Sequence, residues 1–193
     1  MVSLLSMASM EFVEFENVIF EGIGLSLLSV TSSPFVMINC TFRNIYSSQI
    51  TPFISIENLL PEVDVKILFY NVTMENIKVK YQLINLNNAV LSVTDSTFRN
   101  LTRIWDSGAD LTNNDLEYLD AVHGVPITAD LDGDLIVSNS RFTDIGTHCI
   151  VANRARLRVF NSTFDNTNYI SERTTPSTID KYWGVSWIKA ISS

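Results

Sequence analysis

The residues with the clearest potential for chemistry are three aspartates at alternate positions, followed later by three arginines at alternate positions. They are Asp130, Asp132, Asp134, Arg154, Arg156 and Arg158. Carboxylates at alternate positions open calcium-binding loops, but the bidentate glutamate that closes such a loop is absent downstream. Carboxylates and bases in one groove could also carry acid–base catalysis. The sequence leaves three interpretations open: surface ion pairs, a structural calcium site and a catalytic groove.

The histidines and cysteines indicate neither a metal centre nor a disulfide. His123 and His148 have no cysteine or second histidine at ligand spacing. The sequence contains no nucleophile elbow, phosphate loop or zinc signature, so we expect no cofactor. Cys40 and Cys149 fall in different columns of the repeat described below. A disulfide needs Cα atoms about 4.4–6.8 Å apart, so we expect two buried, unpaired thiols.

Four asparagines begin N-x-Ser/Thr sequons and are candidate glycosylation sites: Asn39, Asn71, Asn100 and Asn161. Three of them start a repeated phrase at a predicted corner, where the side chain can point outward. If the chain enters the secretory pathway, we expect glycans along one edge of the molecule. Asn100 occupies another position of the repeat, which could instead form an inward asparagine ladder.

The secondary-structure elements that position these residues can be read from a short sequence motif that occurs six times. It reads Asn/Asp, two residues, a large apolar residue, one residue, Asn/Asp/Gly and usually Ile or Leu. The copies are Asn17–Ile23, Asn39–Ile45, Asn71–Ile77, Asp95–Leu101, Asn139–Ile145 and Asn161–Thr167, and their starts lie 22, 32, 24, 44 and 22 residues apart. A unit of about 22 residues with β-type composition is typical of a solenoid.

Three columns of the repeat are apolar when each copy is numbered from its leading Asn/Asp as position zero. Position +3 contains Phe20, Phe42, Met74, Phe98, Phe142 and Phe164. Positions −2 and −4 are equally apolar, as in Phe69 and Ile67. Inward positions that alternate in this way predict strands from −4 to −2 and from +1 to +3. The +3 column is the expected core ladder.

Corners are predicted where the alternation breaks. Two residues intervene between −2 and +1, and position +5 contains only Asn, Asp or Gly, which tolerate positive φ. A third strand aligns at segments such as Leu27–Val30 and Phe53–Ile56. The predicted fold is an all-β, right-handed parallel β-helix of about 7–8 coils.

The outward positions support the same register. Opposite charges alternate at +4, as in Glu21, Arg43, Glu75 and Arg99. In this alignment Asp132 shares a position with Arg154, and Asp134 with Arg156, in consecutive coils. We therefore favour stacked surface ion pairs over a metal site for the Asp/Arg run.

Two steps of the repeat are long. Extra residues lie at 59–64, and a longer insertion lies at about 104–124. We favour an excursion from the solenoid for the second insertion, with one or two helical turns at 113–122. A degenerate extra coil is the alternative, because 44 is twice 22.

Length, charge and hydropathy limit the number of domains and the kinds of partner that the chain can have. The 193 residues suffice for one domain, and a formal net charge of −8 argues against nucleic acid or an anionic membrane as partner. No run of about 18 apolar residues predicts a membrane span. Leu4–Ser6 and Gly184–Ser193 each resemble the region around Leu27–Ser29. We therefore expect either a segment of a longer solenoid or end-to-end self-association.

The phrases NCTFRNI, DSTFRNL and NSTFDNT resemble the coils of pectin-lyase-like right-handed β-helices. They are most similar to repeats of polymorphic outer-membrane proteins and of large surface proteins of unicellular eukaryotes, ciliates included. The resemblance covers essentially the whole chain and implies the fold. It implies no single activity, because this scaffold hosts lyases, hydrolases, esterases, adhesins and structural stalks.

The catalytic motifs of the pectin-lyase-like enzymes can be compared with this sequence. Polygalacturonase-like motifs are absent, since His123-Gly124 is only a fragment of one. Resemblance to pectate lyases would imply a calcium carboxylate cluster with an arginine base. The nearest candidates are Asp130, Asp132 and Asp134 with Arg154 and Arg156, beside the 104–124 loop.

We expect a non-catalytic extracellular or cell-surface β-helix: a stalk, adhesin or fibre-forming subunit carrying N-linked glycans. A pectin-lyase-like carbohydrate-active enzyme is the alternative. A polysaccharide-binding module is a third, which exposed aromatics would favour. Trp105, Trp183 and Trp187 could stack on sugars, although Trp183 and Trp187 align with core-type positions.

Overall fold

The computed structural model describes residues 3–60, 65–104, 124–165 and 188–191. These residues form strands joined by turns and loops, and no helix occurs among them. The strands build three parallel sheets, which we call A, B and C. Since helices are absent from the part that the structure describes, none there is long and apolar enough to cross a bilayer.

Each coil contributes one strand to each sheet, in the order A, B, C. Sheet A contains β1 (Ser3–Ala8), β4 (Ser26–Thr31), β7 (Ile54–Glu57), β10 (Ile84–Asn87), β13 (Ile127–Asp130), β16 (Ile150–Asn153) and β19 (Ile188–Ile191). Sheet B contains β2 (Val13–Glu16), β5 (Phe35–Ile38), β8 (Lys66–Tyr70), β11 (Val90–Thr94), β14 (Asp134–Ser138) and β17 (Arg156–Phe160). Sheet C contains β3 (Ile19–Glu21), β6 (Thr41–Ser47), β9 (Thr73–Val79), β12 (Thr97–Arg103), β15 (Arg141–Ile145) and β18 (Thr163–Asp165).

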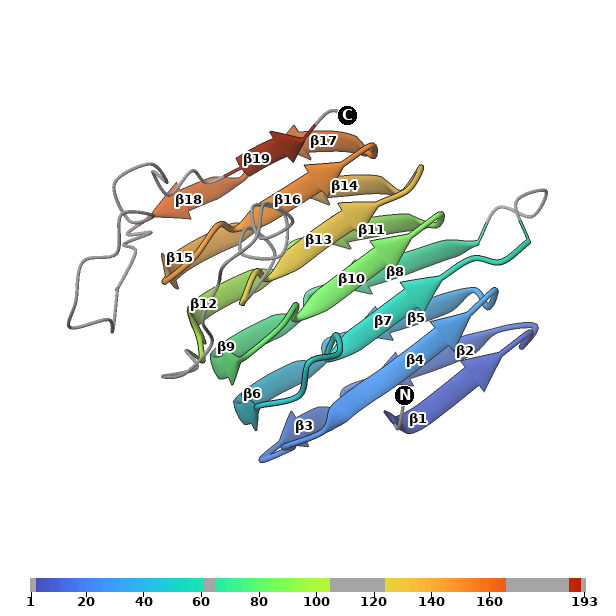
Figure 1. Ribbon diagram of the computed structural model, residues 1–193, viewed down its shortest axis with the longest axis horizontal. Coiled ribbons are helices and arrows are strands. Elements are labelled where there is room, and N and C mark those ends of the chain that lie inside the picture. The colour runs from blue at the N-terminus through green and yellow to red at the C-terminus, as the bar shows by residue number, and fades with distance from the viewer. Residues whose placement is uncertain (1–2, 61–64, 105–123, 166–187, 192–193) are drawn as a thin grey trace, which may run out of the picture.

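The chain is therefore a right-handed parallel β-helix, as the repeat predicts. Sheet A runs from left to right in front, sheet B returns behind it, and the coils climb from β1 to β19 (Figure 1). The predicted count of 7–8 coils is too high. The described residues form six complete coils, and β19 adds a seventh strand to sheet A.

The apolar columns form one continuous core inside the coils. Rings of the +3 column stack: Phe98 and Phe142 have centroids 4.7 Å apart at 4° between planes. Phe42 and Phe20 are 4.6 Å apart, and Phe142 and Phe164 are 4.9 Å apart. Met74 continues the column between Phe42 and Phe98. Burying each such side chain contributes about 1.5–3 kcal/mol.

Both asparagine columns lie at positive φ. At +5, Asn44 and Asn100 have φ of 54° and 51°. The sheet C strands β6, β9 and β12 nevertheless continue through this position, so +5 is a kink within a strand and not a corner. Position zero is the corner, and Asn39 and Asn71 there also have positive φ, of 54° and 52°.

Serines at +1 fill the inside of this corner. Ser96 Oγ donates to the Thr94 carbonyl and accepts from the Val72 amide in the preceding coil. Ser140 Oγ makes the same contacts with Ser138 and Ser96. These hydroxyls satisfy backbone amides that the tight bend removes from the strand ladder.

The coils on either side of the long insertion pair directly. Strand β12 pairs with β15, and β10 pairs with β13, with no coil between them. Residues 105–123 lie outside the described part of the chain, and so does the helical segment predicted at 113–122. Ile104 and Gly124 flank the insertion, and their amides donate to Val79 and Tyr81 of the preceding coil.

Candidate functional site

The structure does not gather the Asp/Arg run into one centre. Asp130 ends β13 on sheet A, Asp132 lies in the following turn with φ of 64°, and Asp134 begins β14 on sheet B. Asp134 Oδ2 pairs with Arg158 at 2.7 Å. The predicted partner of Asp134, Arg156, is its register neighbour, but the ion pair forms with the arginine two residues further along the same face.

No group of three or more His, Cys, Asp or Glu side chains in the described ranges is arranged to hold a metal ion. Asp130 instead accepts a hydrogen bond of 2.9 Å from Asn153 in the next coil. The alternation that makes Asp130, Asp132 and Asp134 resemble a calcium loop spreads them over two sheets and a turn. Their carboxylates therefore serve separate surfaces.

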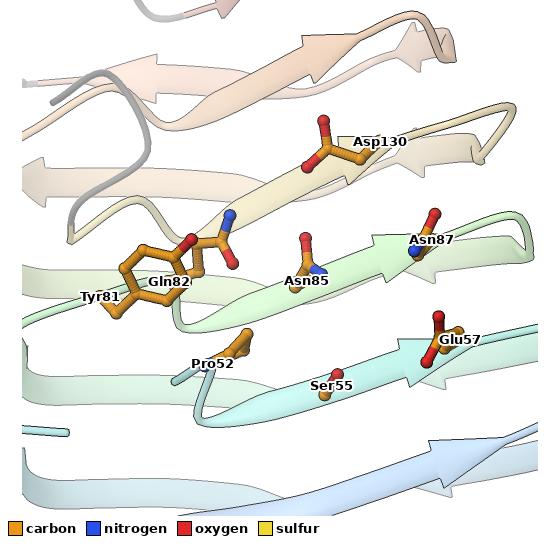
Figure 2. Close-up of a pocket in the computed structure, with 8 residues that line it drawn as sticks. All are labelled: Pro52, Ser55, Glu57, Tyr81, Gln82, Asn85, Asn87 and Asp130. Atoms are coloured by element: carbon orange, nitrogen blue, oxygen red, sulfur yellow. The ribbon is translucent and has the colours of Figure 1, made fainter. Parts of the chain in front are cut away.

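A polar hollow of about 250 Å³ lies on the outer face of sheet A. Its floor is formed by the outward side chains of three neighbouring strands, as Figure 2 shows: Ser55 and Glu57 from β7, Asn85 and Asn87 from β10, and Asp130 from β13. Pro52, Tyr81 and Gln82 close one end of it. Glu57, Asn87 and Asp130 are register partners in one column.

The hydrogen-bonding groups of the hollow differ in how far they are buried. Burial raises the pKa of Tyr81, and the negative charge of Asp130 raises it further. Asn85 Oδ1 is buried and accepts no hydrogen bond. Two carboxylates separated by one strand, about 9.6 Å at the usual strand spacing, flank amide side chains. Such a surface can bind the hydroxyl groups of a neutral, polar ligand.

The sequence pattern marks only Asp130 among the residues of this hollow. It does not mark Glu57, Tyr81, Asn85 or Asn87. The third strand aligns on its inward apolar residues, while its outward residues vary in type. A polar column such as Ser55, Asn85 and Thr128 was the available signal.

The four sequon asparagines are all exposed. Asn71 Nδ2 donates to Asn39 Oδ1 at 2.8 Å, and Asn39 Nδ2 donates to Asn17 Oδ1 at 3.2 Å. Asn100 Nδ2 donates to Asn76 Oδ1 at 2.8 Å. The ladder at +5 is therefore on the outside, and the inward ladder considered for Asn100 is wrong.

Both cysteines are buried and unpaired, as predicted. Burial raises the pKa of the Cys149 thiol to about 12. A thiol with so high a pKa is not a nucleophile at neutral pH, because the thiolate is the reactive form. Cys40 Sγ donates weakly to the Phe15 carbonyl at 3.3 Å inside the corner.

Other sequence candidates lie outside the described residues. These are His123 and the three tryptophans Trp105, Trp183 and Trp187. His148 lies on the turn before β16 and is partly exposed.

Comparison with known proteins does not assign the chain to a family. No protein-family model, curated protein or solved structure matches the chain.

Proposed function

We propose that this chain is a non-catalytic, extracellular structural β-helix of a stalk, adhesin or fibre, whose exposed corners carry N-linked glycans. The observation that supports this most is the use of its polar surface side chains. They bond mainly from one coil to the next: Arg43 pairs with Glu21 at 3.0 Å, and Arg99 pairs with Glu75.

Stiffness is the property that such contacts provide. Each coil is tied to its neighbours by three parallel ladders, by the stacked rings inside and by the asparagine columns outside. An exposed ion pair contributes only about 0–1 kcal/mol, but it repeats with the coil and opposes register slips. A surface arranged in this way serves rigidity rather than a single reactive centre.

The corner asparagines support the glycan part of the proposal. Asn39 and Asn71 are exposed, and the amide nitrogen of each uses one of its two protons in the ladder. The second proton is the one that a glycan would replace. Carbohydrate on this edge would therefore leave the ladder intact.

The test is secretion of the chain from a eukaryotic host, followed by intact mass with and without N-glycosidase. We expect at least two occupied sites. Thr41→Ala, Thr73→Ala and Thr163→Ala each remove a sequon while keeping the asparagine, and Thr73→Ser keeps the sequon as the matched control. A mass unchanged by the glycosidase would refute the glycan part.

A polysaccharide-binding or polysaccharide-cleaving surface is the second candidate, favoured by the hollow on sheet A. Amides, a tyrosine and two carboxylates converge there on one concave patch. Titration with neutral and acidic oligosaccharides tests it, with Asn85→Ala and Asn87→Ala as binding variants. Heat of binding that both variants abolish, or release of shorter products, would favour this candidate over the purely structural role.

A further inference from the structure

The outer face of sheet B carries several apolar side chains that point away from the core. Its outward side chains include Val36, Leu68 and Ile136 in one column and Ile38 and Tyr70 in the next. Tyr70 is 43% exposed. Thr94 and Ser138 continue the second column towards the exposed Phe160, and their hydroxyls bond to each other at 3.1 Å. Covering this face would therefore leave few polar groups without partners.

The two ends of the same face carry opposite charges. On β2, Glu14 and Glu16 point outward and are exposed. On β17, Arg156 and Arg158 point outward and are exposed. Arg158 also pairs with Asp134, whereas no described residue forms an ion pair with Arg156. The face is thus acidic at one end and basic at the other, with a mostly apolar middle that also contains the exposed Lys66 and the Asp134 paired with Arg158.

We propose that sheet B is the interface of a homodimer in which two copies pack face to face with their coils in antiparallel order. This arrangement has a two-fold axis parallel to the strands, between β8 and β11, the middle pair of the six strands. A surface that meets a copy of itself must be self-complementary about such an axis. Parallel rods would instead place glutamate on glutamate and arginine on arginine.

The strand order fixes which residues meet. Strand β2 faces β17 of the second copy, β5 faces β14, and β8 faces β11. In the central column, Glu14 then meets Arg158, Val36 meets Ile136, and Leu68 meets Ser92 of the second copy. The Glu14–Arg158 contact forms twice by symmetry, Glu16 meets Phe160, and Val36 packs on Ile136 on either side of the axis.

The size of the face sets the expected strength. Six strands at about 4.8 Å, each about 16 Å long, give a flat area of about 450 Å² per copy. Side-chain relief raises the buried surface of such a pair to about 1,000 Å² or somewhat more, at the low end of specific interfaces. We therefore expect a reversible dimer with micromolar affinity that weakens as salt is added.

Sedimentation velocity of the unglycosylated chain, from about 1 to 200 µM at low salt, tests this range of affinity. We expect a monomer–dimer equilibrium that stops at two. The double variants E14K/E16K and R156E/R158E should each weaken dimerisation at least about tenfold, because like charges then meet. An equimolar mixture of the two variants should restore it, since two basic ends then meet two acidic ends.

Two single variants separate the apolar centre from general effects. Leu68→Glu on sheet B should abolish the dimer, while Tyr46→Glu, on the outer face of sheet C and 57% exposed, should leave it unchanged. Thermal unfolding of each variant verifies folding. A monomer throughout the concentration range, failure of the mixture to associate, or an open-ended series of larger species would overturn the proposal.

Discussion

At the scale of the residue, the corner asparagines combine two properties that no other residue type supplies together. Asn71 lies at φ of 52°, and its side-chain amide donates to Asn39 of the preceding coil. Glycine tolerates the backbone angle but has no amide, while most other side chains bear a steric cost there. The repeated Asn/Asp is thus explained by backbone geometry before any question of glycans.

Substitution of Asn71 should separate these two properties. Asn71→Gly keeps the backbone angle but loses the ladder bond, at about 0.5–1.5 kcal/mol, and adds about 0.5–1 kcal/mol from the greater freedom of the unfolded chain. Asn71→Ala adds left-handed strain of about 1–2 kcal/mol. Urea unfolding of the unglycosylated proteins measures both. A smaller loss in the alanine variant than in the glycine variant would show that the backbone angle is not strained.

Cys149 should make the free energy of unfolding depend on pH in the alkaline range. Its pKa is about 12 in the folded protein against an ordinary value of 9.0, so above pH 9 the unfolded chain holds fewer protons than the folded one. The free energy of unfolding should therefore fall as pH rises, by about 1.4 kcal/mol per pH unit from this group. Below pH 9 the group contributes no pH dependence.

Comparison with Cys149→Ala isolates this effect, because all other titrating groups are shared. The difference in unfolding free energy between wild type and variant should be constant from pH 7 to about 8.5 and should shrink between about pH 9 and 10.5. A difference independent of pH would mean that the folded thiol titrates normally. Thiol-reactive reagents should label neither cysteine of the folded protein at neutral pH.

At the scale of the element, the sequence predicts the strands well because inward residues recur with the coil. The register at +4 is confirmed, since Arg43 and Arg99 pair with Glu21 and Glu75. What the sequence did not predict is where each strand ends. Asn and Gly tolerate positive φ both in a corner and in a kink, so residue type alone could not assign the corner to position zero rather than +5.

The stacked rings should dominate the stability of these elements. Phe98→Ala removes a fully buried ring from between Met74 and Phe142, and we expect a loss of about 3–5 kcal/mol. Phe160→Ala is the matched control, because that ring points outward and is 53% exposed. At low protein concentration it should change stability by less than about 0.5 kcal/mol. Similar urea midpoints for the two variants would contradict a core made of this column.

At the scale of the whole molecule, the solenoid follows from the period, while the hollow on sheet A does not. Its lining residues lie up to 78 positions apart, from Pro52 to Asp130, and come from three coils. Each coil supplies different outward side chains, so no repeated signal marks the patch. The Asp/Arg run, by contrast, attracted attention through local spacing, which the chain then divided between two sheets.

The insertion gives the last prediction, because the solenoid is continuous without it. A Cβ added to Gly124 would lie 2.6 Å from Cβ of Arg103, so the two flanks of the insertion are in contact. Strands β12 and β15 already pair across the gap. Replacing residues 105–123 by a three-residue Gly/Ser linker should therefore preserve the fold. The shorter loop reduces the entropy cost of closure by roughly 1.6 kcal/mol, which offsets part of any lost contacts.

Far-UV circular dichroism and the unfolding midpoint measure the result, and we expect the β-sheet signal to persist with a midpoint within a few degrees of wild type. The control deletes the same length from within the coils, residues 139–157. That deletion shifts the following strands out of the 22-residue period and moves apolar residues to the surface, so it should unfold the protein. If excision of 105–123 were equally destructive, those residues would have to form a coil-like part of the core.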